Sequence, residues 1–268
     1  MDNNTYIFVD GSYYNFYRYY ALIQWWKNSH PEEVLEDPYQ NAEFVEKFKK
    51  THIENLQQIN KRLNISREIN PILIVGKDCK REEIWRMKHF PGYKGTRDKK
   101  GDFKGGLFFK MVYEDNLFVK GGAKEIVKHP HLEADDCIAL YVKYLLNKHD
   151  NACQIYIITS DKDYLQLSGP NVHLYTLAYK TIIGTGDPKR DLQIKIIMGD
   201  SSDNIPSIFP KCGPKTAQKC IDNPEFFQKK MDENNNFVKQ YELNQLLVDF
   251  DNIPHDLQYE FMSSHSLV

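Results

Sequence analysis

Three carboxylates stand within four positions of the string HLEADDCIAL, at Glu133, Asp135 and Asp136. The apolar residues after them recur at helical spacing, which predicts a first helical turn, where the helix dipole favours each acid by about 0.3–1 kcal/mol. Two carboxylates about 4 Å apart repel each other by roughly 4 kcal/mol at an effective dielectric constant of 20. Three converging acids therefore either spread into water or share a cation.

Six further acids follow predicted strands or helical runs. They are Asp10, Asp78, Asp161, Asp163, Asp200 and Asp203. Each one alone is also explained as an ordinary cap or turn residue. In open α/β sheets, however, the carboxyl ends of the strands face one crevice where ligands bind. Because carboxylate oxygens suit hard divalent cations, the nine acids together predict a metal site.

Short apolar runs alternate with helical patterns along the chain. Runs at 5–10, 71–76, 153–160 and 171–177 predict buried strands, and helices are expected after Ser12 and over 41–63. This alternation predicts an α/β fold with a mostly parallel central sheet flanked by helices.

A basic stretch, CKREEIWRMKHFPGYKGTRDKK, covers 79–100. Its cations are Arg81, Arg86, Lys88, Lys94, Arg97, Lys99 and Lys100, and Trp85, Phe90 and Tyr93 lie among them. One interpretation is a solvated helix with an apolar inner face. The other is a phosphate-binding segment in which cations hold a nucleic-acid backbone and aromatic rings stack on bases.

A third element, IPSIFPKCGPKTAQKCI, covers 205–221. Gly213 and Pro214 interrupt the chain, and a helix is expected to restart after them. This is either an ordinary corner between helices or a hairpin in which Lys215 and backbone N–H groups bind a phosphate.

Composition sets broad limits. The 268 residues are 41% hydrophobic and 27% charged, enough for one large domain or one domain with an appendage. The net charge of −2 becomes positive once the nine acids are set aside, which allows a basic surface around an acidic pit. Five cysteines with no CxxC pair, no secretory signal and no membrane-length apolar run predict a reduced intracellular protein without a zinc site.

Five motifs in this order resemble the 5′-nuclease superfamily, which includes flap endonucleases and 5′→3′ exonucleases of phage and bacterial type. The motifs are FVDGS, FPGYKGTR, LEADD, ITSDKDYLQL and IMGDSSDNIP. The similarity runs from Thr5 to Ile221, and continues more weakly through 244–254. It implies a PIN-like fold with a helical arch at about 93–126 and a C-terminal helix–turn–helix. The expected division is a nuclease core at 1–185 and a helical duplex-binding region at 186–268.

The resemblance implies a structure-specific DNA nuclease with two Mg²⁺ or Mn²⁺ ions, acting as a monomer on branched or 5′-ended duplexes. Asp78, Glu133, Asp135 and Asp136 would surround one ion, and Asp161, Asp163, Asp200 and Asp203 the other, with Asp10 binding water. Lys94 and Arg97 would contact the scissile phosphate. The products would carry a 5′-phosphate and a 3′-hydroxyl.

The resemblance and the basic stretch also predict DNA contacts. These are assigned to Arg81, Arg86, Lys88, Tyr93, Lys211, Gly213, Lys215 and Thr216. The hairpin would hold a potassium ion, although it is one residue longer than the family pattern and has Ser207 and Lys211 where glycines are common. One extra residue also separates Asp78 from Tyr93.

Alternatives remain open. A PIN-type ribonuclease shares the acidic pit but lacks YKGTR and GPKTA, and an inactive branched-DNA-binding protein could share the fold. A haloacid-dehalogenase phosphatase would need an acid where Ser12 stands. Gly105-Gly106 and Gly121-Gly122 bracket an apolar stretch in the expected arch. That stretch is either a surface loop followed by a packed helix, or an arch whose 99–106 segment orders over a threaded strand.

Overall fold

The fold is built on a five-stranded sheet in the computed structural model, which describes residues 4–96 and 103–267. The strand order is β3-β2-β1-β4-β5, and each pairing is parallel. The strands are β1 (Thr5–Asp10), β2 (Ile72–Gly76), β3 (Glu125–Val127), β4 (Gln154–Ile158) and β5 (Val172–Tyr175). The predicted α/β class and four predicted strands are confirmed. Sequence reading missed β3, which has only three residues at the sheet edge.

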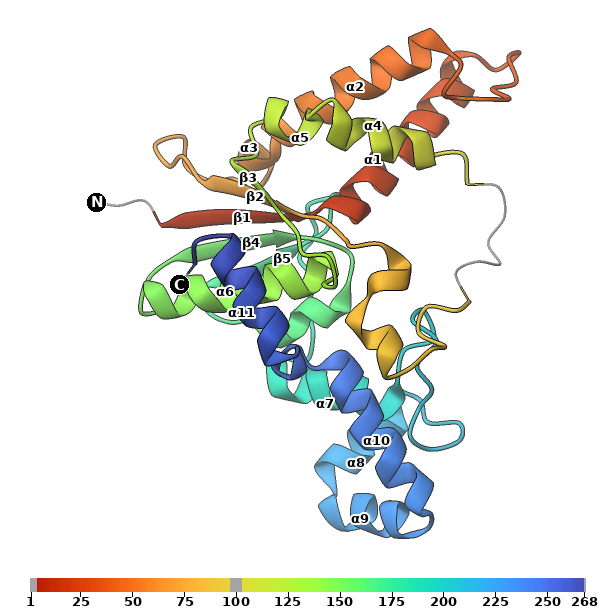
Figure 1. Ribbon diagram of the computed structural model, residues 1–268, viewed down its shortest axis with the longest axis vertical. Helices are drawn as coiled ribbons and strands as arrows, with labels where there is room; N and C mark the ends of the chain where they lie inside the picture. Colours follow the sequence, from red (N-terminus) through yellow and green to blue (C-terminus); the bar gives the residue numbers. More distant parts are fainter. Residues whose placement is uncertain (1–3, 97–102, 268) are drawn as a thin grey trace.

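Both faces of the sheet are buried, as expected for parallel strands. Along β1, Ile7 and Val9 enter a core with α1 (Gly11–Ser29), α2 (Ala42–Gln57) and α4 (Gly106–Glu114). Tyr6 and Phe8 point to the opposite core, with α6 (Ala134–Lys148) and α11 (His255–Ser264). Figure 1 shows the sheet between these two helical layers.

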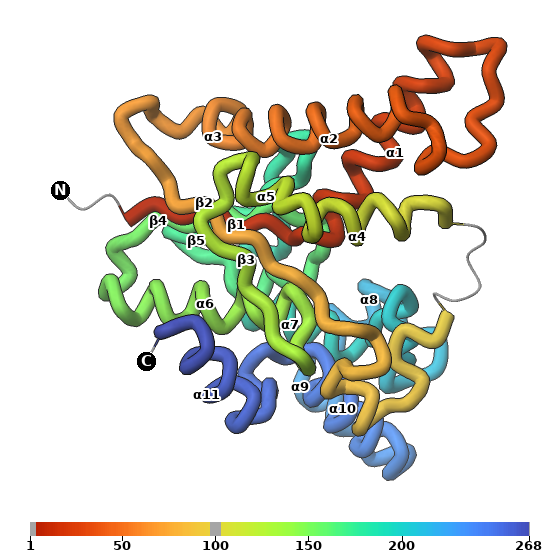
Figure 2. Tube along the Cα trace, turned by 45° about the horizontal axis from the view of Figure 1, so that its top comes forward, coloured from red at the N-terminus to blue at the C-terminus, as the bar shows by residue number. Residues whose placement is uncertain are grey.

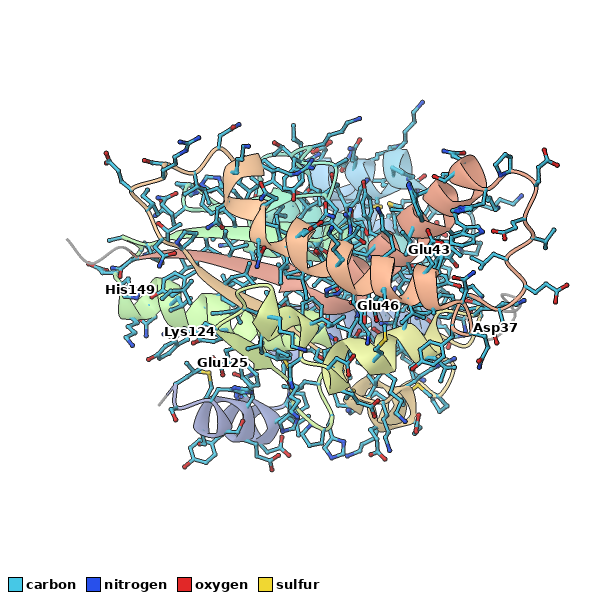
Figure 3. All side chains as sticks on the ribbon, turned by 90° about the horizontal axis from the view of Figure 1, so that it is seen from above. Asp37, Glu43, Glu46, Lys124, Glu125 and His149 are labelled. Atoms are coloured by element: carbon cyan, nitrogen blue, oxygen red, sulfur yellow. The ribbon has the colours of Figure 1, made fainter. Side chains whose placement is uncertain are left out.

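The α6 helix runs against the direction of the strands. In Figure 3, His149 at its carboxyl end lies toward the start of β1, and the Tyr6 hydroxyl is 3.0 Å from His149 Nε2. The first turn of α6, with its acids, therefore lies at the carboxyl end of the sheet. Asp10 ends β1 at that same edge, in register with Gly76 of β2.

The stretch between the two glycine pairs is packed onto the core. It forms α4 and α5 (Leu117–Lys120), and Phe108, Met111 and Phe118 are buried. Gly121 approaches α2 so closely that an added Cβ would lie 2.6 Å from Leu56 Cδ2, and Gly122 has φ +101°. These two glycines serve close packing and a turn. The C-terminal part of the expected arch of about 93–126 is thus packed against the core, and the bounds of the arch stay a prediction.

The remaining helices form a cluster at one end of the molecule (Figure 1). They are α7 (Pro188–Met198), α8 (Pro214–Asp222), α9 (Pro224–Asp232) and α10 (Asn235–Val248); the short α3 (Ile59–Arg62) continues α2. Helix α8 begins at Pro214 after Gly213, as the sequence predicts, and Asn223 alone separates it from α9. Within the described ranges, no helix has the length and apolarity that crossing a membrane requires.

The packing of α4 yields a stability prediction. Phe108→Ala should lower the free energy of unfolding by about 3–5 kcal/mol, because it empties a site between α1, α2 and α4. Leu107→Ala, at a neighbouring side chain that is 52% exposed, is the matched control and should change it by less than about 0.5 kcal/mol. Urea unfolding followed by circular dichroism measures both. Equal, small effects would mean that α4 is not packed in solution.

Candidate active site

The first carboxylate group lies at the amino-terminal end of α6. The Glu133 backbone N–H donates to Asp136 Oδ2 at 3.1 Å, as in a capping box. The Ala134 N–H donates to Asp78 Oδ1 at 2.8 Å, which ties the end of β2 to the helix. Carboxylate oxygens of Glu133, Asp135 and Asp136 lie within 4.8 Å of one another. These acids converge and do not spread into water.

A buried arginine offsets part of this charge. Arg86 is 2% exposed in the turn η2 (Trp85–Lys88), and two of its nitrogens donate to the two oxygens of Asp136 at 2.7 Å each. One of them also lies 3.2 Å from Glu133 Oε2. The predicted DNA contact of Arg86 is wrong, because a guanidinium enclosed in this way is not presented to a surface phosphate.

Asp136 is the least available acid of the first group. Besides the two Arg86 nitrogens, Trp85 Nε1 donates to its Oδ2 at 3.1 Å, as does the Glu133 N–H. Its carboxylate is fully buried. Four donors therefore already compete with any cation for these two oxygens.

Tyr93 and Lys94 lie between the two acid groups. The Tyr93 hydroxyl is 2.9 Å from Glu133 Oε2 and 3.1 Å from Asp203 Oδ2. Lys94 Nζ pairs with Glu133 and is 4.0 Å from Asp203 Oδ2. The Tyr93 ring is only 3% exposed, so its predicted role as a DNA contact is wrong, and buried Trp85 cannot stack on a base either. Lys94 lies at the acids, and its predicted contact with the scissile phosphate stays a prediction.

The second carboxylate group joins the end of β4 to the end of α7. Oxygens of Asp163, Asp200 and Asp203 lie within 4.8 Å of one another. Asp161 caps the 3₁₀ turn η4 (Lys162–Leu167) by accepting from the Asp163 N–H at 2.9 Å. Gly199 precedes Asp200 with φ +67°, and an added Cβ would lie 2.4 Å from the Ile205 carbonyl oxygen. Only glycine fits this turn, which aims Asp200 at Asp163.

A lysine that the sequence reading missed sits within this second group. Lys195 Nζ is 2.5 Å from Asp163 Oδ1 and also pairs with Asp200. Lys195 is the single charged residue in the run IKIIM of α7, and that isolation is the one signal that could have drawn attention to it. Each acid group thus has one lysine ammonium beside it, Lys94 for the first and Lys195 for the second.

Asp10 links the acids across the sheet edge. It accepts from the Tyr13 N–H at 3.0 Å, and the Thr159 hydroxyl lies 3.4 Å from its other oxygen. Burial, together with the negative charge of Asp78 and then Asp161, raises the pKa of Asp10 to about 7. Asp78, whose Oδ2 accepts from the Ser12 hydroxyl, connects this centre to the first group.

Burial affects the carboxylates unequally. It raises the pKa of Asp163 to about 7, with help from the charge of Asp161. The pKa of Asp135 is raised by burial and by the charges of Asp136 and Glu133. Burial also favours the neutral form of Glu133, but Lys94 and Arg86 outweigh it and lower the pKa. A bound cation would favour the charged form of the acids whose pKa values are raised, so the pattern fits an oxygen-ligand metal centre.

The other predicted DNA contacts lie nearer the surface. Lys88, Lys211 and Lys215 are exposed, and Gly213 and Thr216 are partly exposed at the start of α8. Arg81 donates to the Lys94 carbonyl at 2.7 Å and so helps hold that loop. Arg97, together with Lys99 and Lys100, lies outside the described residues.

Comparisons with known proteins identify the family. Residues 5–192 match the family described as 5′-3′ exonuclease, N-terminal resolvase-like domain. The chain belongs to this 5′-3′ exonuclease family. A 5′-3′ exonuclease of Buchnera aphidicola subsp. Acyrthosiphon pisum is 30% identical over 226 residues, which is 81% of this chain and 70% of that protein. The family that the motifs resembled is confirmed.

Other members are larger, and the solved structures are more distant. The chain is 33% identical over 144 residues to DNA polymerase I of Treponema pallidum, matching 50% of this chain and 14% of the polymerase. For DNA polymerase I of Rhizobium leguminosarum the identity is 37% over 98 residues, 34% of this chain and 9% of the polymerase. The D15 protein of phage T5, co-crystallised with metal ions, has a TM-score of 0.65 at 20% identity, covering 98% of this chain and 99% of that one. At this identity the likeness shows the fold, which agrees with the expected PIN-like arrangement of a mostly parallel sheet, flanking helices and a C-terminal helical region.

The placement of Lys195 yields a prediction. In chelating buffer, Lys195→Met should be less stable than wild type by about 1–3 kcal/mol, because Asp163 and Asp200 lose their shared counter-charge. Added Mn²⁺ should then raise its melting temperature more than that of wild type, since no ammonium competes for the site. Lys189→Met, at an exposed lysine on the same helix, is the control. Differential scanning fluorimetry decides, and a smaller Mn²⁺ response in Lys195→Met would show that the lysine supports the cation.

Proposed function

We propose that this exonuclease-family protein is a structure-specific 5′ nuclease that hydrolyses DNA phosphodiesters with two divalent cations, Mg²⁺ or Mn²⁺. The observation that carries the proposal is the pair of carboxylate groups, each within 4.8 Å, on either side of Tyr93 and Lys94. The T5 D15 flap endonuclease, a structural neighbour, was crystallised with DNA and metal ions. The Buchnera relative is named a 5′-3′ exonuclease.

The donor set suits such cations, because each group offers only carboxylate oxygens. Asp78, Glu133 and Asp135 would hold one cation, with Asp136 orienting them. Asp161, Asp163, Asp200 and Asp203 would hold the other, with Asp10 between the groups. When bound, the cations would lower the pKa of water and stabilise negative charge that develops on the oxygens of the reacting phosphate.

The chain itself supplies position and positive charge. Lys94 stands between the two groups, where its ammonium would stabilise negative charge that develops on the reacting phosphate. Arg97 is proposed to contact the same phosphate. A water oxygen bonds to phosphorus and gives up a proton to solvent, the P–O3′ bond breaks, and the leaving O3′ takes a proton from solvent, so the products carry a 5′-phosphate and a 3′-hydroxyl.

DNA would lie along the cationic surface beyond the acids. Lys88, Arg81 and the start of α8, with Lys211, Gly213, Lys215 and Thr216, are proposed to hold the duplex backbone. The same proposal includes a potassium ion at this hairpin and a monomeric protein. It also includes a boundary near residue 185 between the nuclease core and the duplex-binding region. The threading hypothesis for 99–106 depends in part on residues 99–102, which lie outside the described residues.

Removing one acid tests the nuclease assignment. Asp135→Asn should abolish Mg²⁺-dependent cleavage of a 5′-flap duplex and leave duplex affinity in Ca²⁺ equal or slightly tighter, because one negative charge facing the phosphate is lost. Asp256→Asn, at an exposed acid on α11, is the control and should cleave normally. Cleavage by Asp135→Asn at the wild-type rate would contradict the assignment. Cleavage of single-stranded RNA in preference to DNA would favour a PIN-type ribonuclease.

Substitutions at two lysines should separate the rate of cleavage from the affinity for DNA. Lys94→Ala should lower the single-turnover cleavage rate by about 10²–10³-fold with a small effect on affinity, because its charge acts at the reacting phosphate. Lys215→Ala should weaken duplex binding and flatten its dependence on salt, with the single-turnover rate at saturation unchanged. Fluorescence anisotropy and rapid-quench kinetics measure the two quantities. If Lys94→Ala lost affinity alone, Lys94 would be one more backbone contact.

A further inference from the structure

The end of α10 carries none of the nine acids, yet two acid-bearing parts of the chain are hydrogen-bonded to it, and so is Arg86, which binds the first acid group. We call residues 244–250 the α10 exit segment; it runs from the last turn of α10 into η5 (Phe250–Asn252). Its contacts are made by three polar side chains, Arg86, Gln166 and Asn244. Figures 1 and 2 show α10 beside α7 and near the chain segment that carries Arg86.

Arg86 connects the exit segment to the first acid group. Its Nε donates to the Leu247 carbonyl oxygen at 2.7 Å, while its other two nitrogens hold Asp136 and Glu133. Every nitrogen of the buried guanidinium therefore has an acceptor. Because the group is planar and rigid, the position of the Leu247 carbonyl restricts the direction of both carboxylates.

Gln166 connects the exit segment to the 3₁₀ turn that carries Asp163. Its Nε2 donates to the Val248 carbonyl at 3.1 Å and to the carbonyl of Asp163 itself at 2.9 Å. Its Oε1 accepts from the Phe250 N–H at 2.9 Å. One amide thus fastens the backbone of Asp163 to two residues of the segment.

Asn244 reaches from the segment to both ends of the loop that carries Asp200 and Asp203. Its Nδ2 donates to the Ile196 carbonyl at 2.9 Å, before the loop, and to the Pro206 carbonyl at 2.8 Å, after it. Asn244 is fully buried, and its Oδ1 accepts from Gln240 at 2.8 Å. Losing this amide would leave two carbonyls without their donor in the interior, which is costly.

We propose that the α10 exit segment is the common platform that positions both carboxylate groups, with Arg86, Gln166 and Asn244 as positioning residues. The proposal rests on the proposed function, because it assumes that these acids hold cations. Acids that repel one another must be held from outside the group, and this segment touches the supports of both groups. Disturbing it should weaken cation binding although no ligand is removed.

The test is Mn²⁺ binding to the whole chain, measured by electron paramagnetic resonance of free Mn²⁺. Asn244→Leu and Gln166→Met keep side-chain size but remove the hydrogen bonds. Each should lower the Mn²⁺ affinity of the site at the second acid group by tenfold or more. The site at the first acid group should keep an affinity near that of wild type. Arg86→Lys combined with Gln166→Met should weaken both sites.

A stability-matched control separates positioning from general destabilisation. Phe108→Leu perturbs the opposite core and should retain wild-type Mn²⁺ affinity at temperatures where circular dichroism shows it folded. If Asn244→Leu does not fold, the partly exposed Gln166→Met decides. Wild-type affinity and stoichiometry in a folded Gln166→Met would overturn the inference and leave the proposed function standing. A wild-type protein that binds no Mn²⁺ would overturn both.

Discussion

Repulsion between carboxylates is the constraint on which the rest of this structure depends. Two groups of three acids each bring oxygens within 4.8 Å of one another, at least partly out of water. Three cationic side chains offset that charge: Arg86 and Lys94 at the first group and Lys195 at the second. Where a counter-charge is close, as at Glu133, the pKa falls; where burial and like charge dominate, as at Asp10, it rises to about 7. Counter-charge is thus distributed unequally among these acids.

The sheet makes this concentration of charge possible. Parallel strands all end at the same edge, so Asp10 at the end of β1, Asp78 after β2 and Asp161 after β4 meet without long loops. Helix α6 runs in the opposite direction and therefore adds its first turn to that edge. The helices beyond Pro188 contribute Asp200 and Asp203, and the end of α10 fastens this loop to the others. The acids at this edge of the sheet are thus held in place by buried hydrogen bonds from two regions of the chain.

The basic stretch divides into inward and outward cations. Arg86 is enclosed with Trp85 and Tyr93, and it serves the acid group, while Lys88 faces the solvent. Within the described part of this stretch, residues 81–88 form two short 3₁₀ turns and not one long helix, so neighbouring residues point in different directions. A cationic side chain in a protein of this family can therefore hold the acids of the site in place instead of binding nucleic acid.

The sequence by itself determined the class of the fold, four of the five strands, the α6 turn and the motifs of the 5′-3′ exonuclease family. These follow from local periodicity and from residue types at fixed short spacings. It could not show β3, because three residues carry no periodicity. Tertiary structure alone decided the direction of Arg86, whose partners Asp136 and Leu247 lie 50 and 161 residues away. It likewise decided that Lys195 enters the second acid group and that Asn244 braces its loop, since such pairings depend on how distant segments pack.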